Sequence, residues 1–328
     1  MPTNLPPDYF RLEEKFRQAG SPEEKVAYLE QMMSVVPKHK GTDHLRADLR
    51  RRLSELRSAP RTQKGPSRQE SVYHIDREGA GQAVVVGPAN VGKSTLVRDL
   101  TNATPEVAPY PFTTWTPTPG MMPIDNVQVQ LIDTPPLNGE HIEPEMMAMI
   151  RRADLVLLML DLQAFPIEQL EESIALLQEH HIVPHHLRER VEVDGYVAYL
   201  PFLVLVNKSD DEELDEDFEV LCELVGEDWP LLPLSLTTKR YINRMKQAVF
   251  QALNIIRVYA KPVGQEIDRS APFVMRRGGT VEEFAGKVHR DFLENFQYAR
   301  IWGHGVYDGQ MVGRDHVLHD EDIVELHA

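Results

Sequence analysis

Residues 87–94 read GPANVGKS, a glycine-containing turn that ends in a lysine and a serine. The apolar stretch Ala83–Val86 precedes the turn and predicts a buried strand, while Thr95–Leu100 continues with a helical pattern. A strand, such a turn and a helix are the context of a P-loop, in which backbone N–H groups and the helix dipole bind phosphate. We therefore predict that nucleotide phosphates contact Gly87, Pro88, Ala89, Asn90, Val91, Gly92, Lys93, Ser94 and Thr95.

Two side chains of the turn and a later aspartate predict a magnesium site. Lys93 would reach the β- and γ-phosphates, and the Ser94 hydroxyl would hold Mg²⁺. Asp133 directly follows the apolar stretch Val127–Ile132, so we expect it at the carboxyl end of a buried strand. P-loop proteins place their Mg²⁺-binding aspartate there. The position after a buried strand is what supports the assignment of Asp133 to Mg²⁺, because Asp-Thr-Pro alone is a common turn.

A third motif predicts which base is bound. Asn207-Lys208-Ser209-Asp210 follows the apolar stretch Leu203–Val206. The Asp210 carboxylate can accept hydrogen bonds from N1–H and the N2 amine of guanine, whereas adenine offers no such pair of donors. Alone, this motif could equally be a helix N-cap. After a strand and a P-loop it indicates GTP or GDP as the ligand and disfavours an ATPase.

Between about residues 80 and 257, strand-like and helix-like stretches alternate. Further buried strands are expected at Leu155–Leu160 and Leu231–Leu234, and helices at 167–180, 212–225 and 239–254. The remainder, about 262–328, is mixed, with a strand expected at Ala271–Met275, a helix at Thr280–Asp291 and short strands between glycine-rich turns. The pattern predicts an α/β fold in which a P-loop domain with a mainly parallel sheet precedes a small C-terminal domain.

The first 75 residues have a different character. Leucines at 45, 49, 53 and 56 share one face of a predicted helix, and the polar stretch 58–71 reads as a linker. The whole chain has a net charge of −16, yet the segment from Lys38 to Arg68 contains ten Lys or Arg and only three Asp or Glu. This local balance of +7 leaves about −23 for the rest. A basic segment on an acidic protein favours RNA as a partner, or docking on the chain's own acidic surface.

The composition also argues against some classes of protein. No stretch approaches the roughly 20 apolar residues of a membrane helix, so no membrane partner is expected. The first ten residues lack the basic start and apolar core of a signal peptide. Cys222 is the single cysteine, which excludes an intrachain disulfide and fits a reducing compartment. We expect a cytoplasmic protein.

Together these motifs resemble the Obg/DRG-like family of translation-factor-related P-loop GTPases. Tyr110-Pro-Phe-Thr-Thr114 is similar to the family's switch I, and the resemblance implies that Thr114 ligates Mg²⁺ and belongs to the catalytic set with Lys93 and Asn90. Ser235-Leu236-Thr237 resembles the box whose backbone N–H contacts guanine O6. Residues 256–328 are similar to the stretch leading into a TGS domain and to that domain itself, a small β-grasp fold. The resemblance implies work on RNA or ribosomes, with protein partners unknown.

The chain departs from the family pattern in two places, at Pro136 and in the interval 162–201. Pro136 stands where the switch II glycine belongs, and proline has no N–H for the γ-phosphate. Leu137 follows where Ras-like enzymes place a glutamine that orients water, an apolar substitution that the family shares. Only about forty residues (162–201) stand where DRG proteins insert a subdomain before the Asn-Lys-x-Asp motif.

The sequence leaves open both the role of Asn90 and the function of the chain. Asn90 could ligate K⁺ between the phosphates, as in some related GTPases, or could simply fill the loop. The first hypothesis is a slow, K⁺-stimulated GTPase that acts on RNA or ribosomes. The second is a GTP-binding adaptor with little or no hydrolysis, because Pro136 replaces the switch II glycine.

Overall fold

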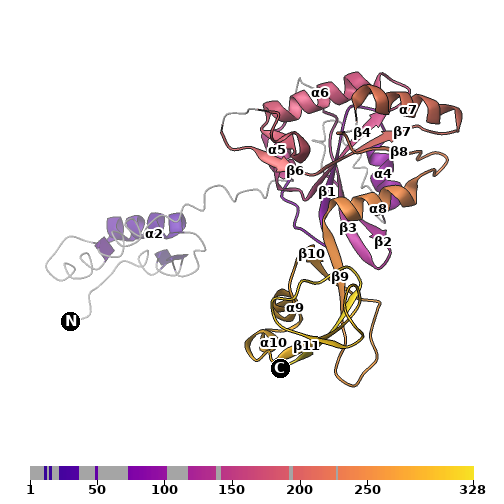
Figure 1. The fold of residues 1–328 in the computed structure, drawn as a ribbon. Coiled ribbons are helices and arrows are strands. Elements are labelled where there is room, and N and C mark those ends of the chain that lie inside the picture. The colour runs from indigo at the N-terminus through magenta and orange to yellow at the C-terminus, as the bar shows by residue number, and fades with distance from the viewer. Residues whose placement is uncertain are drawn as a thin grey trace. The chain divides into compact units, whose positions relative to one another are not determined.

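A computed structural model describes residues 11–12, 15–16, 22–36, 49–50, 73–101, 117–137, 142–191, 195–226 and 228–328 (Figure 1). The predicted switch I, the linker and most of the predicted basic helix lie outside these ranges. The chain divides into two compact units, Met1–Glu70 and Ser71–Ala328. None of the helices in the described ranges combines the length and apolar character that crossing a bilayer requires.

The first unit contains a small helical core. Helix α2 (Pro22–Val35) contributes Leu29 and Met32, which pack with Val36 and Leu49. Within the predicted helix Leu45–Leu56, the structure describes only residues 49–50: both are helical, Leu49 is buried and Arg50 is exposed. At these two positions the leucine packs and the arginine faces solvent, as the pattern predicted.

A six-stranded sheet forms the framework of the second unit. Its strand order is β2-β3-β1-β4-β7-β8, and every neighbouring pair is parallel except β2 with β3. The strands are β1 (Gln82–Val86), β2 (Pro119–Ile124), β3 (Val127–Asp133), β4 (Leu155–Asp161), β7 (Phe202–Asn207) and β8 (Leu231–Pro233). The mainly parallel α/β prediction is confirmed, although β2 was not predicted.

Helices cover both faces of this sheet, because alternate residues of the buried strands point to opposite faces. On one face α5 (Pro144–Arg152), α6 (Pro166–Glu179) and α7 (Glu213–Val225) share a core with Val84 and Leu158. On the other, α4 (Lys93–Leu100) and α8 (Ile242–Ala252) pack with Val85 and Leu157. Short strands β5 (Ile182–Pro184) and β6 (Ala198–Leu200) pair beside the sheet, and a 3₁₀ turn, η1 (His185–Leu187), follows β5.

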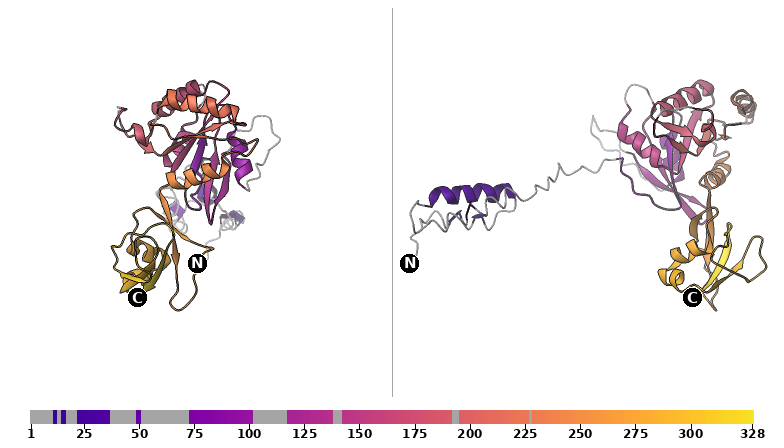
Figure 2. Two further views of the ribbon diagram at one scale, coloured as in Figure 1. Left: turned by 45° about the vertical axis from the view of Figure 1, so that its right-hand side comes forward. Right: turned by 60° about the vertical axis from the view of Figure 1, so that its left-hand side comes forward.

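A second sheet, with order β10-β9-β13-β11-β12, forms the C-terminal part. Its strands are β9 (Ile255–Ala260), β10 (Phe273–Arg276), β11 (Tyr298–Trp302), β12 (Gln310–Val312) and β13 (Asp322–His327). Helices α9 (Val281–Val288) and α10 (Arg290–Glu294) lie together on one side of it (Figures 1 and 2). The core between them includes Phe284, Ala299 and Ile301.

The predicted helix Thr280–Asp291 is therefore wrong as one element. It begins one residue later, because the Thr280 side chain accepts a hydrogen bond from the Glu283 N–H and caps the helix. It ends at Val288, because His289 is extended (φ −166°) and caps the separate helix α10.

The hairpin between β2 and β3 touches the C-terminal sheet. The Asn126 amide donates to the Tyr259 hydroxyl over 2.6 Å and to the Arg269 carbonyl over 3.2 Å. Arg257 lies 3.3 Å from the Asp125 carboxylate and forms a two-point ion pair with Asp320. The hairpin thus covers the sheet face at Arg257 and Tyr259, the face opposite α9 and α10.

Candidate functional site

The P-loop lies between the end of β1 and the start of α4, as predicted. Gly87 (φ 142°) and Gly92 (φ 104°) occupy backbone conformations that side chains rarely adopt. A Cβ atom would lie 2.3 Å from the Met159 carbonyl oxygen at Gly87 and 2.6 Å from the Asn207 amide nitrogen at Gly92. Both glycines are therefore needed for the loop to pass so close to β4 and β7.

Lys93 is buried at the base of the loop. Its Nζ donates to the carbonyl oxygens of Gly87, over 2.9 Å, and Pro88, over 2.5 Å. Burial lowers the pKa of Lys93 to about 8, although nearby Asp133 acts in the opposite direction. Desolvation disfavours the charged form of a lysine, and a bound anion stabilises that form. The buried ammonium of Lys93 therefore favours an anionic ligand, in keeping with the predicted phosphate contact.

Ser94 and Asp133 meet as the magnesium prediction requires. The Ser94 hydroxyl donates to Oδ2 of Asp133 over 2.6 Å. The other carboxylate oxygen, Oδ1, is buried without a hydrogen-bond partner in the described part of the chain. Burial raises the pKa of Asp133, against the opposing effects of Ser94 and Lys93. A hydroxyl and a desolvated carboxylate with a free oxygen fit a hard divalent cation such as Mg²⁺, which Ser94 and Asp133 would serve.

The predicted base-binding residues come together at the ends of β7 and β8. The Asn207 amide donates to the Val91 carbonyl over 2.8 Å, and its Oδ1 accepts from the Leu236 N–H over 3.3 Å. Asn207 thus ties the P-loop to the loop after β8. The Ser235 hydroxyl donates to Oδ1 of Asp210 over 2.5 Å, which orients the carboxylate and leaves Oδ2 available for a guanine.

The sequence did not identify the partner of Lys208. Its ammonium pairs with Asp161, the last residue of β4, and its carbonyl accepts from the Gln163 amide. Asp161 also accepts from the Gln163 N–H, so it fixes the loop beside the base-binding motif. One signal was present: Asp161 ends a buried strand adjacent to β7, and carboxyl ends of parallel strands meet at one edge of the sheet.

Switch II begins with an unusual arrangement. Pro136 offers no N–H, and the N–H of Leu137 donates to the Gly87 carbonyl over 3.0 Å. The Leu137 side chain is buried against the core that contains Met146. Neither residue therefore presents a donor to a phosphate or a polar side chain to a water. Thr114, the other predicted Mg²⁺ ligand, lies outside the described residues.

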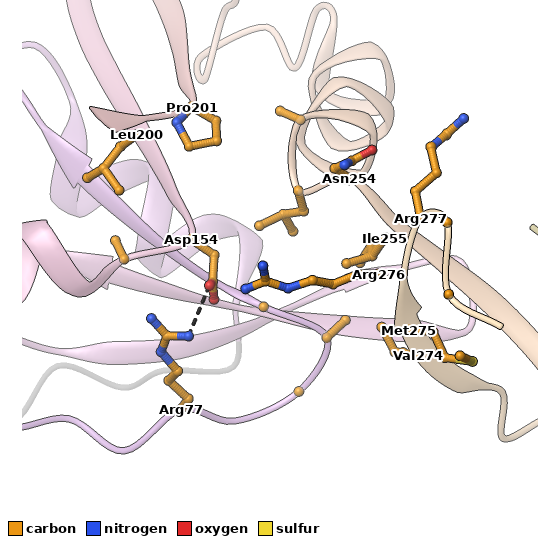
Figure 3. Close-up of a pocket in the computed structure, with 18 of the residues that line it drawn as sticks. Arg77, Asp154, Leu200, Pro201, Asn254, Ile255, Val274, Met275, Arg276 and Arg277 are labelled. Carbon is orange, nitrogen blue, oxygen red and sulfur yellow. Dashed lines mark hydrogen bonds and ion pairs between the residues drawn. The ribbon is translucent and has the colours of Figure 1, made fainter. Parts of the chain in front are cut away.

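A hollow of about 900 Å³ lies at the opposite edge of the sheet (Figure 3). It opens beside residues that precede β1, β4 and β7, such as Gly81, Asp154 and Pro201, and none of the predicted nucleotide-binding residues lines it. Arg77 pairs with Asp154 over 3.0 Å at its floor. This hollow is separate from the nucleotide site, because the P-loop follows the other end of β1.

A P-loop joined to an Asn-Lys-x-Asp base pocket on a mainly parallel sheet defines a P-loop GTP-binding protein. The comparisons agree: residues 82–193 match the family described as 50S ribosome-binding GTPase, and residues 256–328 match the TGS domain. A GTP-binding protein of Methanocaldococcus jannaschii, named as uncharacterized, is 30% identical over 93% of this chain and 92% of its own length. The developmentally-regulated GTP-binding protein 1 of Xenopus laevis is 27% identical over 92% and 98%.

The YchF GTPase of Schizosaccharomyces pombe has a similar fold, with a TM-score of 0.52 at 15% identity over 77% of this chain and 99% of that one. The chain belongs to the Obg/DRG-like family of P-loop GTPases with a C-terminal TGS domain. The alignment with the M. jannaschii protein extends over 365 positions, more than the 328 residues of this chain. Some positions of that protein therefore have no counterpart in this chain. That the short interval 162–201 accounts for them stays a prediction.

Proposed function

We propose that this GTP-binding protein hydrolyses GTP slowly, is stimulated by K⁺ and acts on RNA or ribosomes in the cytoplasm. In this proposal Lys93 contacts the β- and γ-phosphates, Ser94, Thr114 and Asp133 serve the Mg²⁺ ion, and Asp210 selects guanine. A Mg²⁺ ion at this place would neutralise charge on the phosphate oxygens. The residues of the chain would position the nucleotide, exclude water from the P-loop and contribute the Lys93 charge.

The observation that supports stimulation by K⁺ is the burial of Leu137 together with the exposure of Asn90. Because Leu137 is buried, the position where Ras-like enzymes place a glutamine supplies no side chain to orient the attacking water. Asn90 is exposed in the P-loop with a left-handed backbone (φ 66°), and its amide has no hydrogen-bond partner among the described residues. A free amide oxygen beside the phosphates suits K⁺, which would add positive charge where charge develops in the transition state.

Phosphate release in KCl and NaCl at equal ionic strength tests this proposal. We expect faster turnover in KCl and the loss of that difference in Asn90→Ser, while Ala89→Ser, a change at the exposed neighbouring position, should retain it. Equal rates in the two salts would refute the K⁺ role. No release in either salt would instead favour the second function, a GTP-binding adaptor, for which the missing N–H of Pro136 is the specific observation.

The RNA part of the proposal is supported by the charge asymmetry and by the TGS match. Retention of RNA should fall steeply with salt, because basic side chains release counterions when they bind phosphate. Replacing Arg50, Arg51 and Arg52 by Ala should flatten that salt dependence and leave GTP affinity unchanged. If the basic segment instead docks on the acidic remainder of the chain, the triple change should lower the thermal unfolding temperature. Absence of RNA or ribosome retention at low salt, with GTP or GDP bound, would refute the RNA part.

A further inference from the structure

One face of the C-terminal sheet is open and carries aromatic rings. The other face packs on α9 through Phe284 and Ala285 and on α10 through Phe292. Both helices lie on that side of the sheet (Figures 1 and 2). Side chains alternate along a strand, so Tyr298, Arg300 and Trp302 of β11 share the open face, while Ala299 and Ile301 are buried beneath it. The register of the sheet then determines which residues of the neighbouring strands join them.

Strand β13 brings two residues to this face. His327 lies opposite Tyr298, and their rings stack with centroids 4.4 Å apart and planes 13° from parallel. Ile323 lies opposite Trp302. On the far side of β11, the register places Met311, which is 61% exposed, opposite Arg300. We call this set the open sheet face: Lys261, Tyr298, Arg300, Trp302, Met311, Ile323, Glu325 and His327.

The accessible charge on the open sheet face is positive. Glu325 is buried, and its carboxylate is engaged by Lys261 and, over 2.9 Å, by His327. The Lys261 ammonium also lies 4.8 Å from the centre of the Trp302 ring. Arg300 is exposed and has no ion-pair partner within the described residues. An exposed guanidinium therefore stands on β11 between two aromatic platforms, the Tyr298–His327 stack and the Trp302 ring, one face of which Lys261 covers.

From this juxtaposition we infer that the open sheet face binds single-stranded RNA, with bases stacked on Tyr298 and Trp302 and a phosphate held by Arg300. This inference rests on the proposed action on RNA and names the surface and the form of RNA. The two platforms are about 13 Å apart along β11, from a rise of about 3.3 Å per residue. Bases of a single strand can be splayed onto such rings, whereas bases in a duplex are already stacked and paired.

The β2–β3 hairpin limits this surface at one end. It covers the same side of the sheet at Tyr259, whose hydroxyl accepts from Asn126, so the open part begins at Lys261. A strand of RNA on the open sheet face would therefore run beside an element of the nucleotide-binding part, the hairpin whose second strand ends at Asp133.

Tryptophan fluorescence can report on this surface directly. The chain has three tryptophans, so Trp115→Phe with Trp229→Phe leaves Trp302 as the single tryptophan emitter in this chain. We expect a single-stranded oligouridine of twelve nucleotides to quench this emission at low salt, and an RNA duplex of the same length to leave it unchanged. Absence of quenching by the single strand, or equal quenching by the duplex, would overturn the inference.

Substitutions provide the second measurement. Tyr298→Ala should weaken oligouridine binding by about 5- to 150-fold, the range for losing one base–aromatic stack, while Tyr298→Phe keeps the ring and should bind nearly as the parent does. Arg300→Ala should reduce the slope of log affinity against log salt by about 0.7. Arg290→Ala is the matched control, because this exposed arginine lies on α10 and pairs with Glu294. Equal effects of Tyr298→Ala and Tyr298→Phe, or of Arg300→Ala and Arg290→Ala, would contradict the assignment.

The outcome also separates this inference from the broader proposal. If the triple change of Arg50, Arg51 and Arg52 abolishes RNA retention while the variants of Tyr298 and Arg300 retain it, the open sheet face is not the site, and the RNA function stands. If the unsubstituted chain retains no RNA at low salt, the RNA function itself is wrong. Thermal unfolding of each variant shows whether a loss of binding reflects a loss of fold.

Discussion

Replacing Pro136 should change how the protein distinguishes GTP from GDP. The switch II position where a glycine N–H would reach the γ-phosphate is proline, and the following N–H, from Leu137, is used by the Gly87 carbonyl at 3.0 Å. Two consecutive residues therefore give no donor to the γ-phosphate. Pro136→Gly restores one donor, and only GTP can use it, because GDP lacks the accepting group.

The size of the effect follows from one hydrogen bond to a charged group. Such a bond contributes about 1.5–3 kcal/mol, and ordering the backbone of one residue costs about 1 kcal/mol. The expected net gain is therefore about 0.5–2 kcal/mol, or about 2- to 30-fold in the ratio of GTP to GDP affinity. Pro136→Ala also supplies the N–H but loses less backbone freedom on ordering, so its gain should equal or exceed that of the glycine variant.

Calorimetric titration with GDP and with a non-hydrolysable GTP analogue, both in Mg²⁺, measures this ratio. Pro135→Ala is the matched control, because it adds an N–H one residue away from the switch II glycine position and should leave the ratio unchanged. If Pro136→Gly and Pro136→Ala both keep the parental ratio, the reasoning is refuted, and another group must serve the γ-phosphate.

Three further predictions concern the nucleotide site. Asp210→Ala should weaken GDP binding by about tenfold or more, because it removes a charged acceptor for guanine. Asp211→Ala is the control and should leave GDP binding unchanged. Equal affinities of the unsubstituted chain for ADP and GDP would contradict the assignment. Ser94→Ala should abolish the Mg²⁺ dependence of GTP binding and Ser94→Thr, which keeps the hydroxyl, should preserve it, as titration with and without a chelator will show. GTP affinity should fall about fourfold between pH 7 and pH 8.5. Lys93 has a pKa of about 8, so it is mostly protonated at pH 7 and mostly neutral at pH 8.5, where it must regain its proton to bind phosphate. Guanosine shares the base but not the phosphates, so its affinity change over the same range is the control, and equal changes for both ligands would argue against the lysine as the cause.

The nucleotide site could be predicted from the sequence because each motif is local. A P-loop needs its glycines, lysine and serine within a few residues, and Asp133 and Asp210 follow apolar strands that are recognisable one at a time. Parallel strands then bring these carboxyl ends to one edge of the sheet without further information. The same local logic placed Leu49 inside and Arg50 outside.

Contacts between distant parts of the chain depended on the tertiary structure. The use of the Leu137 N–H by Gly87, the pairing of Lys208 with Asp161, and the assembly of Tyr298, Trp302, Lys261 and His327 on one face all depend on which strands are neighbours and in what register. A local pattern specifies that a strand is buried or amphipathic, but a shift of one residue in register would send these side chains to the opposite face. The sequence by itself therefore determined the ligand class and the strands after which the site residues stand, whereas packing decided which side chains meet.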